Sequence, residues 1–349
     1  MFNRSGAGNY AYTSARVRAK KAKLLKEEDY NKLLMMTVPE ISHYISEAGY
    51  SKEMLDLANR YSGLSLLEHA TSANMSKEFR SILKSATGDL NTMVGAYING
   101  WDFENLKIIL RGKNYGLPAD KIRDDLIPAG RLGSEDLEKI ISSPSLEDAL
   151  SLYKAKTGDS VKEEVLSSYR ATLNFGEIED ALTKEYYASL LAAVKGKGRA
   201  AEVFRNYLRY VVDAKNIETV LKLKVEGITG EVAMKYFIPG GAQVDEKVMA
   251  QLAAAPDVLS AANEMQQLKM YAEIKDSLTQ NTTIIDVVAA IDRYIATLAN
   301  KVGIMYPLSV LPIVDYIIHK ENEVRNIRMI AHGIDSGLDR ETMKNLLVI

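Results

Sequence analysis

The stretch WDFENLKIILRGK at residues 101–113 decides the fold, because the chain repeats it twice. The related stretches are VDAKNIETVLKLK at 212–224 and EVRNIRMIAHGI at 323–334. Each contains an asparagine, and these are 111 and 110 residues apart: Asn105, Asn216 and Asn326. An acidic residue lies three positions before each of them: Asp102, Asp213 and Glu323.

The apolar residues after each asparagine follow a helical pattern. They lie one, four and five positions further on, which is the spacing of one buried helix face. The three sets are Leu106, Ile109, Leu110; Ile217, Val220, Leu221; and Ile327, Ile330, Ala331. The pattern therefore predicts three equivalent helices with one buried face each.

Each repeat then shows the same helix-stop signal, a glycine followed directly by an apolar residue. The glycines are Gly116, Gly227 and Gly337. A glycine in the left-handed conformation commonly ends a helix, and the next side chain folds back onto the last turn. An acidic residue soon afterwards, at Asp120, Glu231 and Glu341, predicts a short helix that begins there.

Fainter matches lie upstream of the repeated helices, at 27–45, 134–150 and 244–261. Each has an acidic opening, an apolar helix, a proline and a second helix. The chain is therefore predicted to be all-α, with tandem repeats of about 110 residues. We expect one compact unit with a basic segment at 1–26 and repeats at 27–133, 134–243 and 244–349.

The composition of the 349 residues is that of a folded globular protein, with a formal net charge of −2 and no cysteine. This balance disfavours nucleic acid as a partner, and the missing cysteine excludes disulfides and thiolate metal sites. The N-terminus lacks the apolar core of a signal peptide. The longest apolar stretch, 302–318, contains two prolines and Asp315, so we predict a buried helix pair and no membrane span.

No motif for catalysis is found in the sequence. It has no phosphate-binding loop or nucleophile elbow, and GKGR at 196–199 is interpreted as a flexible connection. The histidines, His43, His69, His319 and His332, have no metal-ligand spacing. We therefore predict no catalytic residue, no metal and no cofactor.

Two groups of residues are candidates for partner binding. The first is the basic position of the last helical turn, Arg111, Lys222 and His332, where stabilisation of the helix end is the competing explanation. The second is the basic N-terminal segment, including Arg16 and Arg18, which either binds an acidic partner or lipid phosphates, or forms a solvated helix face. For the repeated asparagines, a hydrogen bond to a neighbouring backbone is the alternative to partner contact.

The stretch NYAYTSARVRAKKAKLL (9–25), followed by EEDYNKLLMM, resembles the opening of a known family. Together with the threefold D/E-x-x-N-[LIV] helix and its glycine stop, it is similar to the central-stalk C subunits of archaeal-type A/V-type ATPases, which are relatives of the d subunit of the vacuolar ATPase. The resemblance covers essentially the whole chain. It implies a non-catalytic rotor part whose three repeats close into a pseudo-threefold funnel.

The same resemblance implies the partners and the location. The wide end of the funnel would rest on the membrane proteolipid ring and its cavity would receive the central shaft, so that torque passes between ATP chemistry and ion transport. The protein would be cytoplasmic and peripheral to the cell membrane. In the third copy Ala331 and His332 replace Leu-Arg, so strict equivalence of the three faces is not expected. A helical scaffold unrelated to a rotary motor is the alternative.

Overall fold

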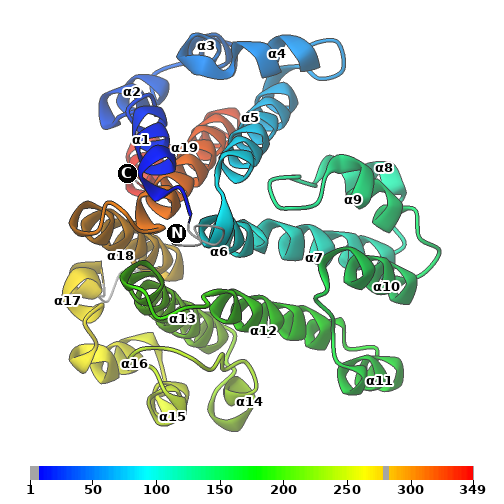
Figure 1. Cartoon of the computed structure of the whole chain (residues 1–349), viewed down its shortest axis with the longest axis vertical. Coiled ribbons are helices and arrows are strands. Elements are labelled where there is room, and N and C mark those ends of the chain that lie inside the picture. The colour runs from blue at the N-terminus through cyan, green and yellow to red at the C-terminus, as the bar shows by residue number, and fades with distance from the viewer. Residues whose placement is uncertain (1–7, 278–282, 349) are drawn as a thin grey trace, which may run out of the picture. The chain divides into compact units, whose positions relative to one another are not determined.

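The structure is a computed structural model that describes residues 8–277 and 283–348 (Figure 1). Over these ranges it is all-helical and contains no strand, as predicted. Two compact units are present: unit 1 is Met1–Thr13 with His69–Lys195, and unit 2 is Ser14–Glu68 with Gly196–Ile349. The start of the basic segment, residues 1–7, lies outside the described residues.

Unit 1 is a continuous run of helices plus the extreme N-terminal segment. Its helices are α6 (Gly88–Ile98), α7 (Gly100–Asn114), α8 (Ala119–Asp124), α9 (Ser134–Ile141), α10 (Leu146–Thr157), α11 (Glu163–Thr172) and α12 (Phe175–Ala193). Helices α1 (Tyr10–Lys21) and α5 (Gly63–Ser85) each have one end in this unit and one in the other.

Unit 2 combines the N-terminal helices with the C-terminal part of the chain. The N-terminal elements are α2 (Glu27–Leu33), α3 (Val38–Ile45), a π-helical turn η1 (Ser46–Tyr50) and α4 (Ser51–Leu57). The others are α13 (Arg199–Val225), α14 (Gly230–Met234), α15 (Glu246–Ala254), α16 (Val258–Glu264), η2 (Met265–Gln267), α17 (Tyr271–Ile274), η3 (Lys275–Ser277), α18 (Ile284–Met305), α19 (Leu311–Asp335) and α20 (Arg340–Asn345).

The three repeated stretches lie in the long helices α7, α13 and α19, as the periodicity predicted. Helix α13 is continuous, whereas the corresponding residues of unit 1 are divided into α6 and α7 at Asn99. The predicted apolar faces are buried in all three helices. The short helices expected after the glycines are α8, α14 and α20.

Each long helix ends in the same hydrogen-bonded turn. The glycines have positive φ values of 67°, 76° and 71°, at Gly116, Gly227 and Gly337. The residue after each glycine donates its N–H to a carbonyl five positions back, for example Leu117 to Gly112 at 2.8 Å. This pattern is the Schellman motif, which satisfies helix-end carbonyls that would otherwise lack donors.

The buried faces form a separate core in each unit. In unit 1, Phe103 and Ile109 of α7 pack in a cluster with Ile140 of α9 and Leu182 of α12. In unit 2, the corresponding face of α13 packs with residues of α15 and α18. Since full burial of one such side chain contributes roughly 1.5–3 kcal/mol, these faces are the main source of stability.

Helices α2 and α3 contact α19 inside unit 2, although the chain separates them by more than half its length (Figure 1). The two units are therefore bounded differently from the repeats proposed from the sequence, and those repeat boundaries remain a prediction.

The apolar stretch 302–318 does form a helix pair, the end of α18 and the start of α19. The prediction that this pair is buried is wrong in part, because Ile304, Met305 and Leu308 are exposed.

Candidate partner interface

The repeated asparagines each hold the chain that returns after the short helix. Asn105 donates its side-chain amide to the carbonyl of Ile127 at 2.7 Å and accepts the N–H of the same residue at 2.9 Å. Asn216 makes the same pair of bonds with Ile238, and Asn326 makes it with Val348. All three asparagines are buried, so their amides serve the backbone and are not exposed to a partner.

The repeated acidic residues of the first two copies bind the backbone just before the next helix. Asp102 accepts the N–H groups of Arg131 and Leu132 at 2.7 and 3.1 Å, two residues before α9 begins. Asp213 accepts three N–H groups, of which Val244 is again two residues before a helix, α15. We call each such contact a joint, since it connects one long helix to the next helical segment.

A glycine makes room for both of these aspartates. A Cβ atom on Gly130 would collide with the Asp102 carboxylate, and one on Gly241 would collide with that of Asp213. The aspartate side chain is short, so it reaches the backbone N–H groups only where the backbone approaches closely. This pairing of aspartate with glycine recurs 111 residues later, so the sequence carries a signal for it in the spacing of the two glycines.

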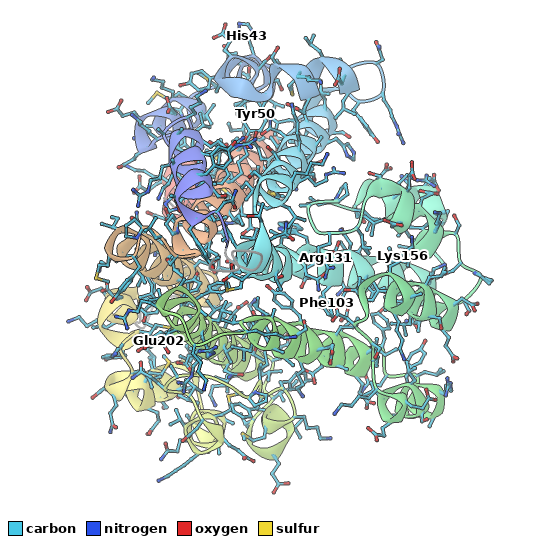
Figure 2. All side chains as sticks on the ribbon, in the orientation of Figure 1. His43, Tyr50, Phe103, Arg131, Lys156 and Glu202 are labelled. Atoms are coloured by element: carbon cyan, nitrogen blue, oxygen red, sulfur yellow. The ribbon has the colours of Figure 1, made fainter. Side chains whose placement is uncertain are left out.

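The third joint has the same position but different chemistry. Glu323 of α19 accepts the N–H of Leu25 at 2.6 Å, two residues before α2 begins. Its other oxygen accepts the Tyr50 hydroxyl at 2.5 Å and the Lys320 ammonium at 2.8 Å. Tyr50 extends toward α19 from the N-terminal helices (Figure 2). Within unit 2, Leu25 and Tyr50 from the N-terminal part of the chain therefore supply partners for Glu323.

Burial controls the ionisation of these groups. It raises the pKa of Asp102 to about 6, against the opposing effect of the two backbone donors. Burial also raises the pKa of Asp213, although three donors oppose it there. The pKa of the Tyr50 hydroxyl lies well above its usual value because the ring is buried and Glu323 is next to it.

Two lysines bridge the helix end to the following helix in the first two copies. Lys113 donates to the carbonyls of Ile141 and Ser143 at 2.7 and 2.5 Å, at the end of α9. Lys224 donates to the carbonyls of Ala253 and Ala255, at the end of α15. An ammonium group is favourable at a helix C-terminus. The 111-residue spacing of these lysines is a signal in the sequence that the repeat alignment did not use.

Each residue at the predicted partner-binding position lies beside a carboxylate. Arg111 pairs with Glu179 of α12, Lys222 with Glu218 of the same helix at 2.5 Å, and His332 with Glu68 of α5 at 2.5 Å. Glu68 and Glu179 are themselves 111 residues apart, so the first and third pairs are equivalent. Each basic group lies about half exposed beside a carboxylate, which reduces the local positive field.

The basic N-terminal segment forms helix α1. Arg18 is exposed and Arg16 is half-buried on this helix. Lys21 instead pairs with Asp315 of α19 at 2.6 Å, so part of the basic run stabilises unit 2. The structure thus places Arg16 and Arg18 on α1, whereas Lys222 lies on α13 and His332 on α19.

The described ranges contain no cluster of three or more histidine or acidic side chains arranged to hold a metal ion. Within the same part of the chain, every helix is too short or too polar to cross a membrane. The geometry is that of buried helix-to-helix joints with charged groups at exposed helix ends.

Comparison with known proteins places this arrangement in context. The family model described as ATP synthase (C/AC39) subunit matches residues 13–346. The C subunit of the A-type ATP synthase of Methanococcoides burtonii is 32% identical over 348 residues, which are 98% of this chain and 95% of that protein. The proteins of the same name from Methanosarcina acetivorans and Archaeoglobus fulgidus are 32% and 31% identical, and cover 99% and 100% of this chain and 94% and 99% of their own lengths.

Proposed function

Because the chain belongs to the ATP synthase (C/AC39) subunit family, we propose that it couples the central shaft of an A/V-type ATPase to the membrane proteolipid ring. It is a structural, non-catalytic subunit of a rotary ATPase, and other subunits of that complex are its partners. The finer proposal is that it turns with the shaft and transmits torque for ATP-driven ion transport or ATP synthesis.

The observation that carries this proposal is the repeated joint. A coupling part has to transmit force between two partners without bending, and buried hydrogen bonds between successive helical segments oppose bending. The third joint is supplied by the N-terminal segment, through Leu25 and Glu323. We therefore propose that the three repeats close on themselves as a pseudo-threefold funnel, which leaves no free repeat at either end.

The proposal also places the protein at the cytoplasmic side of the membrane. Attachment would be through the ring, since the described helices include none that could cross a bilayer. Membranes that contain the ring should bind the chain, and membranes without it should not. Equal binding to both would contradict attachment through the ring.

The test of the coupling role is reconstitution with and without this chain. With it, blocking ion flow through the ring should slow ATP hydrolysis by the catalytic head, because shaft and ring turn together. Without it, hydrolysis should continue when the ring is blocked. If omission leaves the coupling unchanged, the chain is a scaffold and has no coupling role.

We further propose that Arg111, Lys222 and His332 contribute to the wall of the cavity that receives the central shaft, which we call the shaft socket. An acidic shaft tip would then compete with the glutamates that now pair with these groups, of which Glu179 is one. The double variant Arg111→Glu/Lys222→Glu should weaken shaft binding and reduce its salt dependence. The matched variant Glu179→Gln should strengthen binding, because it frees Arg111. Unchanged affinity of both variants at low salt would refute the socket.

A further inference from the structure

A small apolar groove lies between α13 and α18 in unit 2. Val203 of α13 and the residues Leu298 and Val302 of α18 form its walls, and Tyr306 lies at one end. Val203 is almost fully buried, so its side chain is held firmly where it lines the groove. Its volume of about 130 Å³ is suited to one aliphatic side chain and is too small for a folded domain or an extended ligand.

The apolar surface continues out of the groove along the last turn of α18. Met305 follows Leu298 by seven positions and Val302 by three, so the three residues share one helix face. Met305 is 63% exposed, and Ile304 and Leu308 beside it in the chain are 71% and 63% exposed. Met305 therefore adds a large exposed apolar side chain to the helix face that lines the groove, and exposed apolar surface of this kind marks an interaction site.

Basic groups border this apolar surface. The Arg199 guanidinium lies over the Tyr306 ring at 4.9 Å and donates to its hydroxyl at 2.7 Å. Lys197 and Lys301 are exposed nearby in the chain. The acidic residues paired with this border are Glu202, at 3.2 Å from Arg199, and Glu273, at 3.7 Å from Lys301. Of the five charged residues named here, three are basic and two are acidic, so this border carries a small positive excess.

The corresponding turn of the first copy differs in being covered by other residues of the chain. The turn between α5 and α6 is covered by Asn9, which donates to the carbonyl of Ser85 at 2.8 Å and accepts the N–H of Thr87 at 3.0 Å. That turn is polar and closed by the protein's own N-terminal residues. The end of α18 and the turn before α19 instead carry large apolar side chains at 304, 305 and 308, and these are exposed.

We propose that this α13–α18 surface, defined by Val203, Leu298, Val302, Met305 and Arg199, binds an amphipathic segment of another protein of the complex. The segment inserts one aliphatic side chain into the groove and places carboxylates opposite Arg199 and Lys197. A protein segment fits better than a lipid surface, because the walled groove accepts a single side chain. This inference rests on the proposed function in one respect only, namely that the partner is another protein of the rotary ATPase.

The absence of cysteine from the sequence permits a sharp test in the reconstituted complex. Met305→Cys, labelled with a benzophenone maleimide, should crosslink on irradiation to one partner protein, at a segment that contains an aliphatic residue next to carboxylates. Leu173→Cys is the matched control, because Leu173 is an isolated apolar residue of unit 1 that is 74% exposed. Attachment only to lipid, or the same product from both positions, would overturn the proposal.

Affinity measurements with the crosslinked partner complete the test. Met305→Asp/Leu308→Asp should weaken its binding at least tenfold, and Arg199→Glu should weaken it less and lower its salt dependence. Ile285→Asp, at the other end of α18 and 59% exposed, should leave binding unchanged. Helix content and melting temperature establish that each variant is folded. A missing crosslink in a complex that is still coupled defeats this inference alone, whereas coupling that persists when the chain is omitted from the reconstitution defeats the proposed function.

Discussion

The joints made by Asp102 and Asp213 differ from the joint made by Glu323 in the length of chain between the two bonded residues. Asp102 binds residues 29 and 30 positions further along the chain, whereas Leu25 and Glu323 are 298 positions apart. The entropic cost of closing a loop rises with the logarithm of its length, so closing the 298-residue separation at Glu323 costs roughly 2 kcal/mol more than closing the one at Asp102. The third joint contains the additional buried contacts of Lys320 and Tyr50.

The acidic side chains of the two kinds of joint also differ in length. An aspartate requires a glycine to bring the backbone close, and both aspartates have one. Glu323 is longer by one methylene group and reaches the N–H of Leu25 where Lys23 occupies the place corresponding to Gly130. Sequence-local joints are therefore compact and lack a buried cation, and the long-range joint is a buried ionic cluster.

The largest expected effect follows from removing the acid of the ionic cluster. Glu323→Ala leaves the buried ammonium of Lys320 without its carboxylate, which costs about 3–5 kcal/mol. Hydrogen exchange of the amides in 25–57 and 311–335 should rise accordingly. Replacing the whole cluster with apolar side chains, in Glu323→Leu/Lys320→Met/Tyr50→Phe, should recover much of the stability. Unchanged exchange in the single variant would show that the cluster does not hold the joint.

The second effect concerns pH in unit 1. The folded pKa of Asp102, about 6, lies above the ordinary value of 3.8, so the folded protein retains a proton that the unfolded chain has released. The resulting stability is fully present below about pH 4 and is lost as the pH rises through about 6, a change of about 3 kcal/mol. Fluorescence of Trp101, the one tryptophan of the sequence, can follow denaturant unfolding across this range.

The control for this pH dependence is Asp102→Asn. The amide does not titrate, so the decrease in stability between pH 4 and 6 should become smaller by the Asp102 contribution, even if the variant is less stable overall. The part that remains would come from other groups such as Asp213, whose pKa burial also raises. A slope equal to that of the unchanged protein would show that Asp102 does not cause it.

A smaller effect is expected from the glycines of the compact joints. Gly241→Ala places a methyl group against the Asp213 carboxylate and 3.0 Å from the carbonyl oxygen of Val244, at a cost of about 1–3 kcal/mol. Lys23→Ala, at the corresponding place of the third joint, should change stability by less than about 0.5 kcal/mol. Thermal unfolding of both variants measures this difference, and equal shifts would contradict the division between the two kinds of joint.

The smallest effect is expected outside the joints, at the exposed helix ends. Arg111→Met removes an ion pair whose partners are 54% and 26% exposed, so stability should change by about 0.2–1 kcal/mol, and by less at high salt. The melting temperature at low and high salt measures this. A loss as large as that of Glu323→Ala would mean that the helix ends, and not the joints, hold the repeats.

Much of this arrangement was accessible from residue spacing. The three helices, their buried faces, the glycine stops and the short helices after them were predicted, since each depends on residues within a few turns. The spacing of Gly130 and Gly241, and of Glu68 and Glu179, carried similar information that the alignment on the asparagines did not use. The roles of Lys320 and Tyr50 had no such signal, because Lys320 occupies the place of Asn99 in the first copy and of Tyr210 in the second.

The sequence by itself determined the helices, their periodicity and where each ends, because helical spacing and left-handed glycines act over a single turn. Only the tertiary structure decided that Leu25 and Tyr50 meet Glu323 of α19, since no local pattern specifies which acceptor a distant N–H will meet. It also decided that Arg111 and His332 are paired and that Met305 is exposed. The physical reason is that burial and ion pairing depend on the surroundings that other segments create, and those surroundings exist only after the chain has folded.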